Sequence, residues 1–330
     1  MKKLMLIAAA CVALASCVKN EVEPIRIDDA PIGFQAVQAL ESTRAAFEGT
    51  SFVASAYLMN GDVATEWDDT AAANKQQYFA TQVVTKSSGK WTTDTPYYWP
   101  KQGSLSFYAY TPESVDAGDW DANLNYVFNA YDAKTQNVDF MVADIAKDLK
   151  ANDVPAVFRH KLTQLQVEAK QSVVDARVVT LKSVYLDNMQ YIGTYTQPYN
   201  YQFGVYDDKW EQNGATTYYE LLKADVPVNS TSAVEIDEAH NFFLPQALAA
   251  QTLYVEYTIA HNGATETVKH TLNLKDIDDA STHSIAGRVN DDKWLQNEKI
   301  TITLNIGLNE QIEWAPEQID WDEEGITINI

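Results

Sequence analysis

The clearest pattern in this sequence is a strict alternation of apolar and polar residues over short stretches. It runs through 301–308, where every second residue is large and apolar, and it recurs at 104–110, 252–259 and 267–274. A period of two is typical of a strand that buries one face. The last two stretches flank an Asn-Gly pair, which favours positive φ, so they predict a β-hairpin.

Two further stretches, 162–169 and 178–186, predict another pair of neighbouring strands. Helical patterns are weak, and short helices are predicted only at 139–149 and 218–222. The chain is therefore predicted to be mainly antiparallel β. Because the sequence after Arg44 is longer than a single sandwich needs, we expect two domains.

We place the boundary between the two domains near the midpoint of the chain, where no Gly/Ser-rich linker marks it. The expected domains are 32–168 and 169–330. The stretch before them, 17–31, is charged and contains two prolines, so we interpret it as a tether rather than as part of either fold.

The N-terminal end predicts export and lipid attachment. Two lysines precede an apolar run at 4–15, which is too short to cross a bilayer as a helix, a task that takes about 20 residues. The run ends in Leu-Ala-Ser-Cys, which matches the lipobox of bacterial lipoproteins. We therefore expect 1–16 to be a signal peptide cleaved between Ser16 and Cys17, with palmitate on the Cys17 thiol. The alternative is an ordinary signal peptide with a chance cysteine.

Charge and cysteine content restrict the partners and the chemistry. The formal net charge is −22, and such a surface repels phosphate backbones, so nucleic acid is not expected as a partner. The second cysteine, Cys11, lies inside the expected signal peptide. The mature chain then has no thiol for a disulfide, for thiol catalysis or for a thiolate metal site.

No catalytic or metal-binding arrangement is recognisable in the sequence. The G-x-S-x-G, Walker A and H-E-x-x-H motifs are absent, and the five histidines lack metal-ligand spacing. The stretch 119–123 begins like a calcium loop, but Leu124 stands where the loop needs glycine and Ala130 where it needs glutamate. A second acidic cluster at 320–325 has the glycine, but the chain ends before the last ligand position. We expect no enzyme activity, no cofactor and no metal.

Several segments together resemble the fimbrillin family, the subunits of type V pili. In chain order they are 91–112, which contains Tyr97-Tyr98-Trp99-Pro100; 139–143 with 157–165; 243–246 leading into 253–255; and Trp294 with Asn297, followed by 312–321. These segments span most of the chain. The resemblance implies a lipoprotein carried to the surface of the outer membrane, with two tandem transthyretin-like antiparallel β-sandwich domains. In the polymerising members an arginine-specific protease removes the first strand, and a strand from a neighbouring subunit fills the groove.

The resemblance extends to the processing region of this chain. The stretch 43–47 (Thr-Arg-Ala-Ala-Phe) is similar to that region of the family, which implies a cut between Arg44 and Ala45. The alternative is that Arg44 is an uncut loop residue. The apolar alternation of Ile32, Phe34 and Ala36 before it suits a removable strand.

The chain ends in a second alternating stretch, in which Ile326, Ile328 and Ile330 are predicted to share one face. They are the candidates for a strand donated to a neighbouring subunit. The alternative is an ordinary last strand that pairs within its own domain.

The expected function is that of a structural subunit of a fimbria, which polymerises with copies of itself or with other pilus subunits and supports adhesion. The alternative is a monomeric surface lipoprotein that binds a glycan or a host ligand. Exposed aromatic residues such as those at 91–99 would then stack on sugars, although core packing is the simpler interpretation of that cluster.

Overall fold

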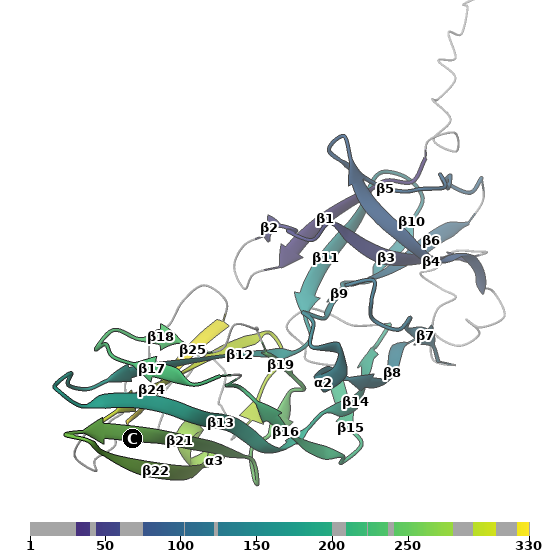
Figure 1. Ribbon diagram of the computed structural model, residues 1–330. Coiled ribbons are helices and arrows are strands. Elements are labelled where there is room, and N and C mark those ends of the chain that lie inside the picture. The colour runs from purple at the N-terminus through teal and green to yellow at the C-terminus, as the bar shows by residue number, and fades with distance from the viewer. Residues whose placement is uncertain are drawn as a thin grey trace, which may run out of the picture.

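The protein is built almost wholly of strands, arranged in two lobes (Figure 1). The computed structural model describes residues 31–39, 44–59, 75–101, 103–121, 125–199, 209–222, 224–236, 241–279, 293–307 and 322–329. The first lobe contains most of the strands between residues 34 and 160, and the second contains most of the strands from residue 163 onward. Only two short helices occur among the described residues, α2 (Ala133–Gln136) and α3 (Leu274–Asp279). The predicted mainly β fold is confirmed.

A nine-stranded sheet forms the first lobe. Its strands are β1 (Phe34–Ala39), β2 (Arg44–Ala46), β3 (Ser51–Met59), β4 (Lys75–Ser87), β5 (Lys90–Thr93), β6 (Ser104–Thr111), β9 (Met141–Ala143), β10 (Ala146–Leu149) and β11 (Val154–His160). Seven of them close on themselves in the order β6-β3-β4-β5-β1-β11-β9, because β9 pairs back onto β6. The other two, β2 and β10, attach to β1 and β6. The ring encloses an apolar core rich in phenylalanine and tryptophan.

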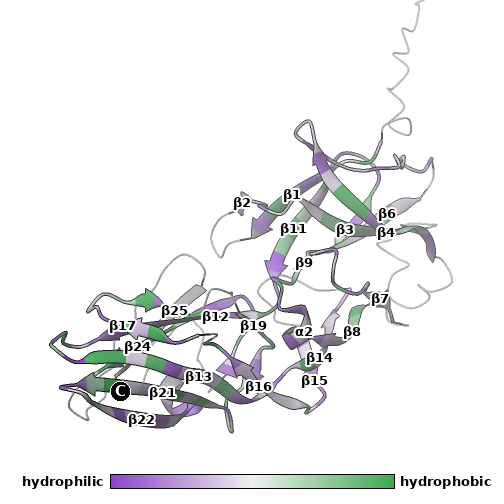
Figure 2. Cartoon of the chain, viewed as in Figure 1, coloured by the Kyte–Doolittle hydropathy of each residue, from purple (hydrophilic) through white to green (hydrophobic). Residues whose placement is uncertain are grey.

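Two facing sheets form the second lobe. One contains β18 (Val234–Glu235), β12 (Thr163–Gln171), β24 (Glu298–Ile306) and β25 (Asp322–Asn329), with β19 (Asn241–Phe243) also on β12. The other contains β16 (Thr216–Glu220), β13 (Val178–Gln190), β21 (Thr252–His261) and β22 (Ala264–Asn273), with β17 (Val226–Val228) also on β13. Buried and partly exposed positions alternate along β24 and along β12 from Leu165 onward, as a period of two requires. Figure 2 shows hydrophobic and hydrophilic stretches along the strands of this lobe.

A four-stranded sheet joins the lobes. It consists of β15 (Lys209–Gln212), β14 (Ile192–Gln197), β8 (Tyr126–Asp132) and β7 (Asp119–Trp120). A separate two-stranded sheet pairs β20 (Gln246–Ala247) with β23 (Lys293–Trp294). Aromatic side chains of the four-stranded sheet contribute to a third apolar core, in which Phe128 and Phe140 contact Tyr195 from β14. The chain passes from β11 to β12 through Lys161 and Leu162, both of which are 1% exposed. The link between the lobes is therefore buried rather than exposed to solvent.

Several predicted elements are confirmed by the structure. The stretch 104–110 lies in β6, and 301–308 overlaps β24. The hairpin joins β21 to β22 through Asn262 and Gly263, which have φ values of 51° and 80°. Both central residues of the turn thus adopt the positive φ that the Asn-Gly pair predicted.

Three predicted features are wrong. The stretch 139–149 is not a helix, because β9 pairs with β11 and β10 pairs with β6. The stretch 218–222 is not a helix either, since β16 pairs with β13. The expected pairing of 162–169 with 178–186 does not form: β12 pairs with β24 and β13 with β21, and the buried side chains of both contribute to one core.

The position of the domain boundary stays a prediction. Residue 168 lies inside β12, whose nine residues all pair with β24 of the second lobe. The first-lobe core uses residues up to Phe158, and the second-lobe core begins at Leu165. This division of the cores favours a boundary a few residues earlier than 168.

Among the described residues, no helix has the length and apolar character needed to span a membrane.

Candidate functional site

The N-terminal strand β1 occupies one position in the closed ring of the first lobe. It runs parallel to β11, with Phe34 to Gln38 opposite Val154 to Phe158, and it meets β5 at a single antiparallel pair, Phe34 with Trp91. Figure 1 shows β1 between these neighbours, close to where the chain enters the lobe. The predicted strand at 32–36 overlaps β1, which begins at Phe34 and completes the ring.

Apolar side chains anchor β1 in the core of the ring. Ile32 is 3% exposed and Phe34 is 5% exposed. The Phe34 ring packs edge-on against Phe52 and Phe107, with ring centroids 5.6 Å and 5.9 Å away. Fully burying one such side chain contributes about 1.5–3 kcal/mol. Removal of β1 would therefore leave an apolar slot between β5 and β11.

A polar contact holds the opposite end of β1. The Gln38 side-chain Nε2 lies 2.7 Å from His160 Nε2, and His160 Nδ1 lies 2.6 Å from a carboxylate oxygen of Asp139. The His160 side chain is buried, at the end of β11. No local sequence pattern predicts this contact, because Gln38 and His160 stand 122 positions apart in the chain.

Arg44 and Ala45 lie in the three-residue strand β2, which runs antiparallel to the end of β1. Arg44 pairs with Ala39, and Ala45 pairs with Gln38. The next core residue, Phe47, stacks on Phe158 with ring centroids 4.7 Å apart. A cut after Arg44 would therefore separate β1 from the chain and leave Phe47 with the body of the protein.

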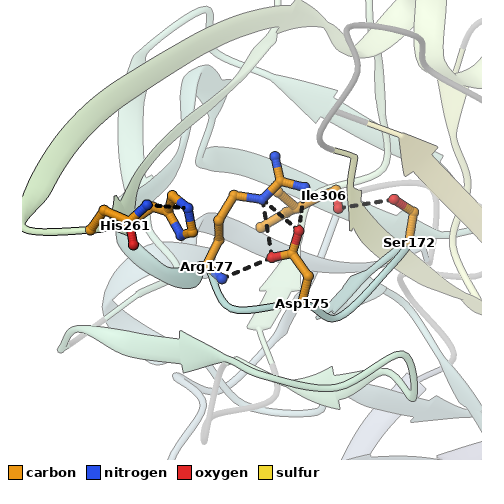
Figure 3. Close-up of polar contacts among 6 residues, drawn as sticks. Ser172, Asp175, Arg177, His261 and Ile306 are labelled. Atoms are coloured by element: carbon orange, nitrogen blue, oxygen red, sulfur yellow. Dashed lines mark hydrogen bonds and ion pairs between the residues drawn. The ribbon is translucent and has the colours of Figure 1, made fainter.

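The arginines with described side chains are held by aspartates. Arg159 contacts both carboxylate oxygens of Asp144 at 2.8 Å. Arg177 contacts Asp175 through its backbone N–H and its Nε, in the loop between β12 and β13 (Figure 3). Ser172 Oγ of the same loop donates to the Ile306 carbonyl at 3.3 Å. Neither guanidinium extends freely into solvent.

The C-terminal strand β25 pairs in parallel with β24 of its own chain. Ile326 lies opposite Ile302, and Ile328 lies opposite Leu304. Within the order β18-β12-β24-β25 this strand is the last, so β24 is its neighbour in the sheet. In the single chain, β25 thus pairs within its own lobe, which is the alternative to donation to a neighbouring subunit.

Three predicted site residues lie outside the described residues, namely Ile330, Ser16 and Cys17. Signal cleavage and lipidation therefore stay predictions.

The acidic stretch that begins like a calcium loop bonds to its own turn. Asp119 accepts a hydrogen bond from the backbone N–H of Trp120, and Asp121 accepts two from Asn125. Among the described residues no group of histidine, aspartate or glutamate side chains is arranged to hold a metal ion.

In the aromatic stretch 91–99, Trp91 and Trp99 are buried in the first-lobe core, which confirms core packing for these two. Tyr98 is 46% exposed.

Residues 43–321 match a family described as fimbrillin-like. The chain belongs to the fimbrillin-like family. This places it among fimbrial proteins of structural rather than enzymatic character. Among curated protein sequences none matches the chain.

A solved structure shares the fold of this fimbrillin-like chain. A fimbrial protein from Bacteroides vulgatus ATCC 8482 is 14% identical, with a TM-score of 0.60 over 91% of this chain and 98% of that one. A candidate cell adhesion protein from Bacteroides uniformis ATCC 8492 is 18% identical, with a TM-score of 0.46 over 84% of this chain and 93% of that one. At these identities the first likeness establishes the fold alone.

If β1 is anchored by its apolar side chains, Phe34→Ala should lower the free energy of unfolding by about 3–5 kcal/mol, because the change leaves a cavity among Phe52, Phe107 and Trp91. The measurement is urea unfolding followed by tryptophan fluorescence. Gln35→Ala, at an exposed position of the same strand, is the matched control and should change stability by less than about 0.5 kcal/mol. Equal effects of the two changes would contradict the anchoring role.

Proposed function

We propose that this fimbrillin-like chain is a structural pilus subunit that polymerises by protease-triggered strand exchange. The observation that carries the proposal is the position of β1, which fills one place in a closed ring and ends at Ala39, five positions before Arg44. One peptide cut there detaches an entire strand of the ring. The partners are copies of this chain or other pilus subunits, and the fibre supports adhesion.

The driving force for assembly is the slot that β1 would leave. The backbone groups of β11 that pair with β1 would lose their partners, and the core around Phe52 and Trp91 would be exposed to water. Unpaired strand edges bind extended segments, which supply ladder hydrogen bonds and place alternate side chains in the pockets. An incoming strand thus restores what the cut removed.

β25 is the candidate donor. Its isoleucines at 326 and 328 alternate with Thr327 and Asn329, as Ile32, Phe34 and Ala36 alternate with polar or small residues before and within β1. β25 pairs in parallel with β24, and β1 pairs in parallel with β11 and antiparallel with β5. An inserted β25 that ran in the direction of β1 would form with β11 the same kind of parallel hydrogen-bond ladder that it forms with β24.

The distribution of arginine supports a cut at Arg44. The chain contains five arginines. Arg159 forms its two-point contact with Asp144 inside β11, and Arg177 is engaged by Asp175. Arg26 and Arg288 lie outside the described residues. Arg44 lies in a short, extended three-residue strand, whereas the guanidinium groups of Arg159 and Arg177 are each paired with an aspartate.

Replacing the expected cleavage residue tests the proposal directly. Arg44→Ala should abolish both the cut and the formation of polymers that survive mild detergent, because β1 stays attached. Mass spectrometry of protein from the cell surface locates the N-terminus, and electrophoresis without heating detects polymers. Arg177→Ala is the matched control and should be processed like the unchanged chain. Polymers built from subunits that retain residues 17–44 would contradict the proposal.

Truncation tests the donor strand. A chain that ends at Glu324 should still be cut after Arg44 but should not polymerise, because it has no strand to donate. A synthetic peptide of residues 322–330 should bind the processed chain and not the uncut one, since only the former has a vacant slot. Undiminished polymerisation of the truncated chain would assign the donor role to another segment.

The expected lipid anchor attaches the subunit to the outer membrane. The supporting observation is the Leu-Ala-Ser-Cys sequence that ends at Cys17. Cys17→Ser should move the protein from the membrane fraction to the soluble fraction and remove labelled palmitate, because serine is not acylated by this pathway. Membrane-bound or palmitate-labelled Cys17→Ser protein would show that the anchor lies elsewhere.

A glycan-binding monomer is the second candidate function. Three tyrosines lie side by side on the outer face of the second lobe, from β16, β13 and β21. Tyr185 stacks on Tyr254 with ring centroids 4.5 Å apart, and Tyr218 is 59% exposed. Aromatic rings on a solvent-facing sheet suit contact with sugars. This function needs no processing, so glycan-array binding by the uncut chain distinguishes it from the first.

A further inference from the structure

Different kinds of side-chain contact fix the two ends of β1 in the first lobe. At the start, Ile32 and Phe34 are buried in the core. At the end, Gln38 makes the polar contact with His160, one residue before the strand stops at Ala39. The proposed cut lies just beyond this polar end. A strand freed at one end opens from that end first, so the Gln38 contact is the first specific side-chain contact that release must break.

The geometry defines the hydrogen bonds of this contact. A carboxylate oxygen of Asp139 lies 2.6 Å from His160 Nδ1, and an ionised carboxylate only accepts, so Nδ1 carries the proton. Nε2 of the neutral ring is then an acceptor, 2.7 Å from the Gln38 amide, which donates to it. Gln38 is therefore bonded to the ring that Asp139 orients.

Two sequence motifs meet at this contact. Asp139 belongs to the segment 139–143, and His160 belongs to 157–165. The pairing of β9 with β11 brings them together, with His160 opposite Met141. Asp139 fixes the ring of His160, and the ring presents Nε2 to the N-terminal strand. Both motifs thus contribute to holding a segment that neither of them contains.

We propose that Gln38, His160 and Asp139 form a clasp that retains β1 and sets the rate at which the strand leaves after processing. This proposal deepens the proposed strand exchange, on which its role in assembly rests, but the clasp itself is a property of the uncut chain. Gln38 leaves with the removed segment, while His160 and Asp139 stay in the body of the subunit. Variation at Gln38 therefore changes the release of β1 without changing the subunit that polymerises.

Hydrogen–deuterium exchange of the full chain tests the clasp without any protease. Gln38→Met keeps the length of the side chain and removes its hydrogen-bonding group. The amides of β1 that pair with β11 should exchange about fivefold faster, the factor that corresponds to one hydrogen bond of about 1 kcal/mol. Gln35→Met, an equal change at an exposed position of β1, should leave exchange within about twofold. Equal exchange in the two variants overturns the proposal.

A second pair of measurements separates the clasp from a general loss of stability. If Gln38 acts through the ring that Asp139 orients, Gln38→Met combined with Asp139→Ala should speed β1 exchange no more than the stronger single change. Fully additive effects overturn the proposal. In both single variants the amides of β21 and β22 in the second lobe should keep their exchange rates, and a rise there would assign the effect to global destabilisation and overturn the clasp.

Processed protein provides the functional readout. After cleavage at Arg44, the N-terminal peptide should dissociate about fivefold faster from the Gln38→Met chain than from the Gln35→Met chain, since it lacks the same hydrogen bond. Equal dissociation rates overturn the role in release. If the chain is never cut at Arg44, the proposed function is refuted. The hydrogen–deuterium exchange result on the uncut chain still tests the clasp, so the two failures are distinguishable.

Discussion

The parallel ladder between β1 and β11 is the interaction on which the first lobe depends. A closed ring of strands has no exposed edge, and this ring is closed by a strand from the very beginning of the fold. The two seams of β1 are unequal: five residue pairs join it to β11, and one pair joins it to β5. The ring is therefore weakest between β1 and β5, and it opens there with the fewest backbone hydrogen bonds broken.

The same strand combines two kinds of stabilisation that respond differently to substitution. The contacts of Ile32 and Phe34 are apolar and non-directional, so any side chain of suitable size can replace them. The contact of Gln38 with His160 is directional, and it requires a particular side chain at one position. A foreign strand can therefore match the apolar part of β1 more readily than the polar part. This difference distinguishes the original strand from a replacement.

The sequence predicted what depends on local pattern. The alternation at 104–110 and 301–308 defined strands, and the Asn262-Gly263 turn defined a hairpin, because each signal lies within a few neighbouring residues. It failed at 139–149, where Ala, Met, Lys and Leu favour helix but pairing with β11 and β6 overrides that preference. The predicted pairing of β12 with β13 was also wrong. An alternating pattern shows that one face of a strand is buried, but it does not show which strand is its neighbour in the sheet. Gln38 and His160 meet only through the whole fold.

The buried link between the lobes has a mechanical consequence. The side chains of Lys161 and Leu162 are enclosed, and the aromatic core around Phe128, Phe140 and Tyr195 takes residues from both sides of that link. Domains joined by an exposed linker swing apart under load and absorb extension. Here tension applied at one lobe passes directly to the other through packed side chains. A filament of such units would resist bending within each unit, and its compliance would be concentrated at the junctions between successive units.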